Sequence, residues 1–434
     1  EKVESHTFAH LSSLQYLELS FNRVRQLTDW RFVGVPSLQL INLGMNYLEA
    51  VNIDDSSSLP NLLYLVLDKN SMREMNTSSF STTLDNLVYL AIKGNQLETL
   101  RAGWLCRAPQ LRTLLLGANH LTRVTNETFC RCPSAMQLLD TLDLFGNEIV
   151  EIEPDAFSCM PQLASRLNLI DNQIGLLTGR VFRQLASLRV LALKVNRLSR
   201  LLDNTFEGLT SLSELYLTYN QIEWIDRYAF AGLYSLKYLE LAYNRLKSAD
   251  SSSMHWLSST HMPNLRDLIL ANNALERIVT SNDTSGDEYH QCSWPRFLTQ
   301  MSITHNSLDR IEPNTFKKCT GEMMRLQVLK LGENRLTVLE NFAFAGLFLL
   351  TELLLNTNPV EVIQSAAFLD LVSLTKLRIE NGNLKVIESN AFSPLAGTLS
   401  ELLLNTNRLL MHGSFTGVFA DYDQLTVLCQ QLGN

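Results

Sequence analysis

An eleven-residue motif, LxxLxLxxNxL, recurs along the whole chain and constrains the fold more than any other feature. LSELYLTYNQI from Leu212 and LQVLKLGENRL from Leu326 are two of sixteen copies, and a seventeenth begins at Leu425. Most copies are 24 or 25 residues apart. Chains with such a period fold as solenoids, in which each repeat packs against its neighbours. The repeat therefore predicts a stack of coils.

The asparagine of the motif occupies an otherwise apolar pattern, and a buried amide without partners costs a few kcal/mol. Stacked coils satisfy it, because strands of neighbouring repeats are ~4.8 Å apart and each amide can reach backbone groups of its own and the adjacent coil. Gly382 interrupts this ladder, and Asn381 or Asn383 is the candidate substitute. The predicted ladder comprises Asn22, Asn46, Asn70, Asn95, Asn119, Asn147, Asn172, Asn196, Asn220, Asn244, Asn273, Asn306, Asn334, Asn358 and Asn407.

A phenylalanine follows the asparagine by ten residues in eleven repeats. Ring stacked beside ring would fill the wide, convex half of each coil, so we interpret these residues as core. They are Phe32, Phe80, Phe129, Phe157, Phe182, Phe206, Phe230, Phe316, Phe344, Phe368 and Phe392, and Phe8 fits the same pattern.

Together these patterns predict an α/β solenoid over residues 1–434, with about sixteen repeats plus partial terminal ones. We expect a parallel β-sheet on the concave face and mostly loop and short-helix returns on the convex face. Neither end shows a polar cap, a signal peptide or an apolar stretch of about 20 residues, so the chain is interpreted as a fragment. The net charge of −8 argues against general nucleic-acid binding.

Seven cysteines suggest disulfides between neighbouring coils. Cys106 and Cys130 share the same offset from their asparagines, and Cys132 and Cys159 nearly do, so these two pairs are expected to reach bonding geometry. Cys292 and Cys319 form a third candidate pair, which leaves Cys429 for a partner elsewhere. Buried free thiols are the alternative, because connectivity is not readable from sequence.

Three triplets match the acceptor pattern for N-glycosylation, and they begin at Asn76, Asn126 and Asn282. All fall outside the strand segments, where a glycan could project without destroying the core. Combined with the cysteines, they predict a secreted or cell-surface protein.

Catalytic and metal-binding patterns are weak. His290 and Cys292, beside Asp287 and Glu288, could be imagined as a metal site, but a solvated acidic loop is the stronger interpretation because recognisable ligand spacing is missing. Cys130-Arg-Cys132 lacks the CxxC spacing. We find no phosphate-binding glycine loop and no GxSxG motif, so we expect neither an enzyme nor a cofactor.

The strand residues between the leucines face away from the core, so function is sought there. One concave region is rich in tyrosine and arginine, which are frequent in binding hot spots. The alternative is that tyrosines simply suit half-exposed strands. A weaker stripe comprises Tyr16, Tyr64 and Tyr89, and the longer repeats, up to 33 residues, carry other candidate loops. The main candidate binding residues are Lys194, Arg197, Tyr216, Tyr219, Tyr238, Glu240, Tyr243 and Arg245.

The motif, its period and the return pattern in AFAGLYSL from Ala229 resemble animal extracellular leucine-rich repeats of the typical class. The many repeats and scattered insertions most resemble a Toll-like receptor ectodomain. That resemblance implies a horseshoe-shaped fold, innate immune recognition of microbial molecules, dimerisation as a homodimer or heterodimer, and a membrane helix and signalling domain outside this chain. Two alternatives stay open, namely a cell-adhesion or guidance-type receptor that binds another protein and an intracellular scaffold.

Overall fold

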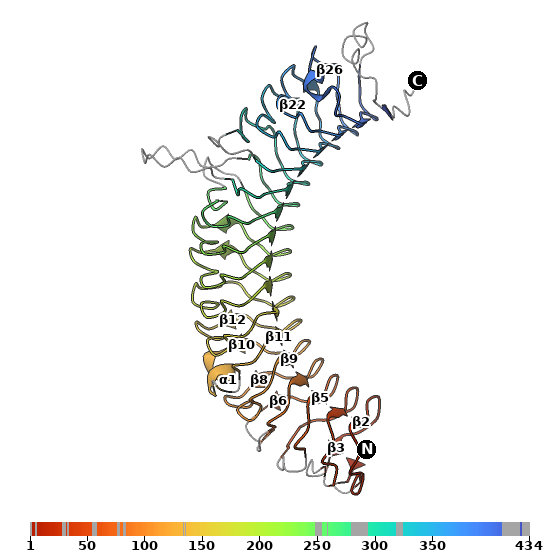
Figure 1. The fold of residues 1–434 in the computed structure, drawn as a ribbon, viewed down its shortest axis with the longest axis vertical. Coiled ribbons are helices and arrows are strands. Elements are labelled where there is room, and N and C mark those ends of the chain that lie inside the picture. The colour runs from red at the N-terminus through yellow and green to blue at the C-terminus, as the bar shows by residue number, and fades with distance from the viewer. Residues whose placement is uncertain are drawn as a thin grey trace. The chain divides into compact units, whose positions relative to one another are not determined.

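The computed structural model describes two units, residues 1–216 and 217–434. Each is a run of coils in which a three-residue strand is followed by a turn and an irregular return (Figure 1). The described residues are 2–4, 7–27, 32, 34–53, 59–75, 79–80, 84–132, 134, 136–247, 254–257, 259–278, 294–317, 324–409 and, for the backbone, 426–427.

In the first unit the strands form one parallel sheet in chain order. The middle residue of each strand is a buried leucine or isoleucine, and most of the flanking residues are at least partly exposed. This alternation is what the LxL core of the motif predicts. The strands are β2 (Tyr16–Glu18), β4 (Leu40–Asn42), β5 (Tyr64–Val66), β7 (Tyr89–Ala91), β9 (Thr113–Leu115), β11 (Thr141–Asp143), β13 (Arg166–Asn168), β14 (Val190–Ala192) and β16 (Glu214–Tyr216).

The returns of the first unit hold short strands and a single-turn helix, α1 (Asn126–Cys130), which lies on the opposite side of the coils from β9 and β11 (Figure 1). Three parallel two-residue pairs join neighbouring returns. The pairs are β1 (Lys2–Val3) with β3 (Gln26–Leu27), β6 (Glu74–Met75) with β8 (Thr99–Leu100) and β10 (Arg123–Val124) with β12 (Glu151–Ile152), and β15 (Arg200–Leu201) lies in a later return.

The second unit repeats this plan. Its sheet contains β18 (Tyr238–Glu240), β19 (Asp267–Ile269), β20 (Gln300–Ser302), β21 (Val328–Lys330), β23 (Glu352–Leu354), β25 (Lys376–Arg378), β27 (Glu401–Leu403) and β28 (Thr426–Val427). The returns hold β17 (Trp224–Ile225), the three-stranded set β22 (Val338–Leu339), β24 (Val362–Ile363) and β26 (Val386–Ile387), and the 3₁₀ turn η4 (Ser393–Leu395). The predicted repeat solenoid with a parallel sheet is thus confirmed.

The ladder asparagines hold successive coils together through the backbone. Asn46 is representative, because its Nδ2 donates to the carbonyl oxygens of Leu43 in its own coil and Leu19 in the preceding one, at 3.0 and 2.9 Å. Its Oδ1 accepts the N–H of Val24, also in the preceding coil. One side chain therefore satisfies backbone groups that no strand ladder reaches.

The residue before each ladder position adopts a left-handed conformation in all sixteen coils, and only two of the sixteen are glycines. A non-glycine residue costs roughly 1–2 kcal/mol there, so the hydrogen bonds on both sides must impose it. In the coil that lacks a ladder asparagine, Asn381 takes this position, with φ 54°. Gly382 itself is crowded, because a Cβ would lie 2.7 Å from the carbonyl oxygen of Asn358.

Stacked rings fill the return side of the coils, as with Phe157 and Phe182, whose centroids are 6.5 Å apart. Three tryptophans extend the same row where phenylalanine is missing. Trp104 stacks on Phe80, and Trp294 packs against Phe316. Trp256 packs edge-on against Phe230, with ring planes 62° apart. The sequence pattern missed them because they do not keep the ten-residue offset.

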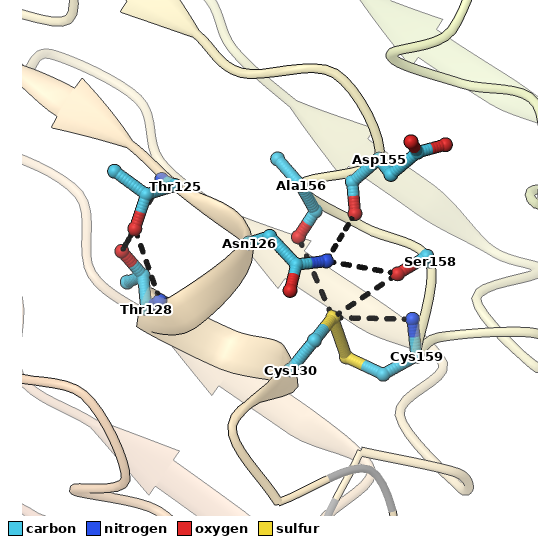
Figure 2. Close-up of a disulfide and its surroundings, with 8 residues drawn as sticks. All are labelled: Thr125, Asn126, Thr128, Cys130, Asp155, Ala156, Ser158 and Cys159. Atoms are coloured by element: carbon cyan, nitrogen blue, oxygen red, sulfur yellow. Dashed lines mark hydrogen bonds between the residues drawn. A yellow bond between two sulfur atoms is a disulfide. The ribbon is translucent and has the colours of Figure 1, made fainter.

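Four of the candidate cysteines form disulfides, but the two pairs expected among these four are wrong. One bond joins Cys106 to Cys132, with Cα atoms 5.2 Å apart. The other joins Cys130 to Cys159, with Cα atoms 5.3 Å apart (Figure 2). Offsets from the asparagine misled because Trp104 sits one position earlier than the usual ring, so Cys106 follows the ring of its coil by two residues and Cys130 follows Phe129 by one. Equal offsets therefore do not mark equal points on adjacent coils.

Candidate binding surface

Two of the predicted binding residues of the first unit meet on its sheet. The Nζ of Lys194 lies 4.6 Å from the ring centroid of Tyr216, in β16, which is a cation–π contact. The Tyr216 hydroxyl donates to Glu214 at 2.7 Å. Arg197 is exposed on the turn that follows β14. This part of the surface therefore combines an aromatic ring with charges of both signs.

In the second unit, Tyr219 and Tyr243 stack with centroids 4.3 Å apart and ring planes 17° from parallel. They remain 53% and 45% exposed. Both occupy the left-handed turn position, with φ 56° and 53°, and not a strand. Desolvation, followed by a hydrogen bond with Tyr243, raises the pKa of Tyr219. Strand propensity therefore explains Tyr238, in β18, but not this pair.

The remaining candidates lie close to Tyr243 in the sequence, and two of them, Glu240 and Arg245, carry charge. Tyr238 and Glu240 are half-buried at the two ends of β18. Arg245 is exposed two residues after Tyr243, and its Nη1 lies 3.6 Å from Oε1 of Glu223. A flat aromatic platform beside paired charges suits recognition of polar, partly planar groups. The tyrosine stripe of the first unit has a related feature, since the rings of Tyr64 and Tyr89 are 5.9 Å apart.

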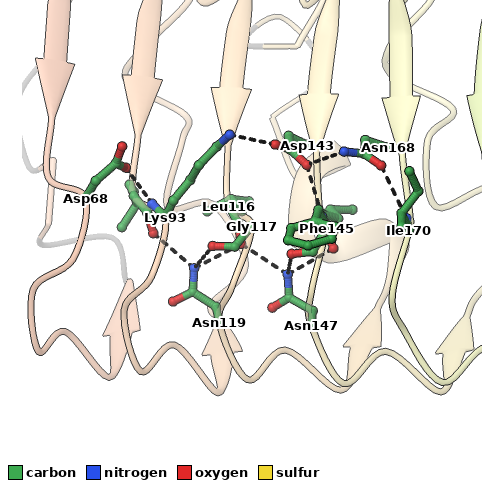
Figure 3. A network of polar contacts seen from close by, with 12 residues as sticks. Asp68, Lys93, Leu116, Gly117, Asn119, Asp143, Phe145, Asn147, Asn168 and Ile170 are labelled. Carbon is green, nitrogen blue, oxygen red and sulfur yellow. Dashed lines mark hydrogen bonds and ion pairs between the residues drawn. The ribbon is translucent and has the colours of Figure 1, made fainter. Parts of the chain in front are cut away.

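A polar network on the first sheet was missed by sequence reasoning. Lys93 Nζ lies 2.8 Å from Oδ2 of Asp143 (Figure 3). Asp143 belongs to the coil two places further along the chain, so one coil lies between the two residues. Asp143 Oδ1 accepts from Nδ2 of Asn168 at 2.9 Å. The intervening coil has Gly117 at the position equivalent to Lys93, so no side chain blocks the reach. The sequence signal that could have found this contact is a lysine and an aspartate in two repeats separated by a repeat with glycine at the lysine position.

Asp68 continues this network on the other side of Lys93. Its Oδ1 accepts the backbone N–H of Lys93 at 2.6 Å. Burial raises the pKa of the Asp68 carboxyl, and the hydrogen bond and charge of Lys93 oppose that rise only in part. Burial, followed by the neighbouring Asp68 charge, also raises the pKa of Tyr89. Asp68 and Tyr89 are therefore both partly desolvated on this sheet surface.

Some predicted sites lie outside the described residues, namely Asn76, Asn282, Cys292, Cys319, Cys429 and the segment with Asp287, Glu288 and His290. Within the described ranges no group of three histidine, cysteine or acidic side chains could hold a metal ion. Of the helices in those ranges, none has the length and apolar character needed to cross a membrane. Asn126 is described, and its amide is engaged within the fold (Figure 2).

Known proteins share parts of this sequence. Mouse (Mus musculus) podocan is 29% identical over 221 residues, which is 46% of this chain and 34% of podocan. Toll-like receptor 3 of Boselaphus tragocamelus is 29% identical over 205 residues, 45% of this chain and 20% of that receptor. Mimecan of Bos taurus is 25% identical over 169 residues, 38% of this chain and 46% of mimecan. The chain thus spans less than half the length of these relatives.

Solved structures share the fold more broadly. The crystal structure of a TLR13–ssRNA13 complex matches 94% of this chain and 66% of the receptor chain, with 25% identity and a TM-score of 0.51. A leucine-rich repeat protein of Leptospira interrogans matches 95% of both chains at 22% identity, with a TM-score of 0.64. This second likeness shows the fold alone.

The repeats themselves match a family model, described as leucine rich repeat, in overlapping segments. The matched residues are 1–48, 12–72, 60–121, 109–174, 164–222, 210–275 and 296–360. They cover well over half of the chain. Proteins built from such repeats typically bind proteins or other ligands and are typically not enzymes. The chain belongs to the leucine-rich repeat family.

Proposed function

We propose that this chain is the ligand-binding ectodomain of a cell-surface receptor that recognises microbial molecules. The observation that carries the proposal is the stacked pair Tyr219 and Tyr243. Two large rings are held half-exposed in a backbone conformation that tyrosine does not favour. Neither core packing nor strand propensity requires tyrosine at these positions, and such rings offer a large contact area with little entropy to lose.

The extracellular setting is supported by the two disulfides, because such bonds persist in oxidising compartments. The similarity to Toll-like receptor 3 and to the TLR13–ssRNA13 structure favours a receptor of innate immunity. Signalling would then depend on parts of the receptor outside this chain, and pairing with a second receptor chain would follow ligand binding. The proposed role is binding, without catalysis or a cofactor.

The test is binding of the purified ectodomain to fixed bacterial cells, compared with Tyr219→Ala/Tyr243→Ala. We expect the double variant to bind at least about tenfold more weakly, as loss of a hot spot of ~1.4 kcal/mol or more produces. Tyr234→Ala is the matched control, because Tyr234 is 55% exposed in the turn before β18 and belongs to no stack with Tyr219. Equal binding by both variants would contradict the role of the pair.

A second candidate is a cell-adhesion or guidance-type receptor whose partner is another protein. The charges on the second sheet favour it, because Lys376 lies 3.4 Å from Glu352, and Arg378 lies 2.9 Å from Glu401. Alternating signs along a sheet suit complementary protein side chains. Binding to animal cells, with none to bacterial cells, would favour this candidate, and charge reversal at Lys376 would then weaken binding while Tyr219→Ala would not.

A further inference from the structure

The acceptor asparagine at position 126 is used by the fold. Asn126 is the first residue of α1, and its Nδ2 donates to the carbonyl oxygen of Asp155 at 2.8 Å and to Oγ of Ser158 at 3.0 Å (Figure 2). Both acceptors belong to the next coil. A side-chain amide has two N–H donors, so both are occupied. A glycan on this nitrogen would replace one donor and place a sugar ring where the next coil lies.

The second recognition element of the triplet is also internal. Thr128 is 8% exposed, and its Oγ1 accepts the N–H of Thr125 at 3.2 Å. In return, Oγ1 of Thr125 accepts the N–H of Thr128. This reciprocal capping box starts α1. An enzyme that reads the threonine hydroxyl can therefore reach it only before the helix forms.

A disulfide closes directly beside the amide. Cys130 ends α1 and is bonded to Cys159, the residue after Ser158. The backbone N–H of Cys159 also lies 3.2 Å from Sγ of Cys130. Moving Ser158 aside for a sugar would carry Cys159 away from Cys130. We infer that glycosylation of Asn126 and closure of the Cys130–Cys159 disulfide are mutually exclusive. Once the disulfide has formed, Asn126 can no longer accept a glycan.

The two competing reactions have simple balances. Glycan transfer forms a bond between Nδ2 and C1 of the sugar, breaks the bond from C1 to the lipid pyrophosphate donor, and releases the Nδ2 proton with that pyrophosphate. Disulfide closure removes two electrons and two protons from the thiols and reduces a protein or small-molecule disulfide of the secretory compartment. The inference rests on the proposed passage through that compartment and is independent of any ligand.

The experiment reads both modifications on one peptide. Trypsin cleaves after Arg123 and Arg131, so the fragment 124–131 contains Asn126 and Cys130, and the fragment 132–166 contains both Cys132 and Cys159. Fragmentation in the mass spectrometer identifies which of these two cysteines is bonded to Cys130. The chain is expressed with a secretory leader in glycosylating cells and digested without reduction. Mass spectrometry then follows the glycan on fragment 124–131, free and linked. We expect fragment 124–131 to carry no glycan on Asn126 when Cys130 is bonded to Cys159. Any glycan on Asn126 should be found only on copies of this fragment that lack that bond.

The variant Cys130→Ser/Cys159→Ser should raise glycan occupancy at Asn126 several-fold, measured on total cellular protein so that poor secretion does not obscure it. The matched control is Cys106→Ser/Cys132→Ser, which removes the other disulfide and leaves the contacts of Asn126 in place. A glycan on a fragment linked through Cys130, an unchanged occupancy in the first variant, or an equal rise in the control would each overturn the inference. Because the leader imposes secretion, these outcomes do not depend on whether the chain is a receptor.

Discussion

Asn147 places its Nδ2 3.1 Å from the carbonyl oxygen of Leu116, one coil earlier in the chain. The same nitrogen is 3.0 Å from the carbonyl oxygen of Leu144, and Oδ1 accepts the N–H of Leu121 at 3.1 Å. Replacing Asn147 by alanine leaves these buried groups unpaired, so we expect a loss of about 2–4 kcal/mol in the free energy of unfolding. Urea unfolding measures the loss, and hydrogen exchange at the Leu121 amide should accelerate.

Asn22→Ala is the control for this ladder prediction. Asn22 is exposed, and its Nδ2 donates to carbonyl oxygens of its own coil. Water can replace those bonds, so the expected cost is below about 1 kcal/mol. Equal losses in the two variants would mean that contacts between coils do not determine the contribution of the ladder.

The Lys93 to Asp143 ion pair should contribute a measurable coupling, because Asp143 is only 13% exposed. We expect a double-mutant cycle with Lys93→Met and Asp143→Asn to give about 0.5–1 kcal/mol at low salt, falling as salt is added. Methionine keeps the apolar stem of the lysine, and asparagine keeps an acceptor for Phe145 and Asn168. Thermal unfolding of the four proteins provides the cycle, and strictly additive effects would refute the coupling.

Asp68 should make stability depend on pH in one direction. Its folded-state pKa is raised by burial, so the folded protein binds more protons than the unfolded chain between the ordinary and the raised value. This carboxyl therefore lowers stability as pH rises through that window. Asp68→Asn removes the effect while keeping an acceptor for the Lys93 N–H. The difference in melting temperature, variant minus wild type, should increase as pH rises above the ordinary pKa of an aspartate and level off once the pH exceeds the raised pKa. A flat difference would contradict the raised pKa.

Trp104 should tolerate phenylalanine but not alanine. Its side chain is fully buried against Phe80, and its Nε1 has no hydrogen-bond partner among the described residues. Trp104→Ala should cost about 3–5 kcal/mol because it opens a large cavity. Trp104→Phe removes the unpaired donor and keeps most of the packing, so its melting temperature should stay much closer to that of the wild type. A similar loss in both variants would show that the indole itself is required.

The features that could be predicted from the sequence are those that recur in every repeat. The strand leucines, the ladder asparagines and the phenylalanine row follow from one motif, because neighbouring coils give each copy the same environment. The features it missed depend on a local change in coil length or on contacts that skip a coil. The pairs expected among Cys106, Cys130, Cys132 and Cys159 were wrong because the ring of the first of these coils, Trp104, comes one residue early. The Lys93 to Asp143 contact was missed because it skips the coil of Gly117. Tyr219 and Tyr243 were recognised as equivalent, but the backbone turn that holds them was not.

The two overlapping disulfides also limit how far the chain can be pulled. A force applied to its ends would pass from Cys106 to Cys132, back to Cys130 and on to Cys159. This path bypasses about 50 residues between Cys106 and Cys159. While the disulfides are intact, those residues cannot be extended, so the stretched chain is shorter by roughly 170 Å. Reduction of the bonds would release this hidden length, so the oxidised coils act as a mechanical stop within the first unit.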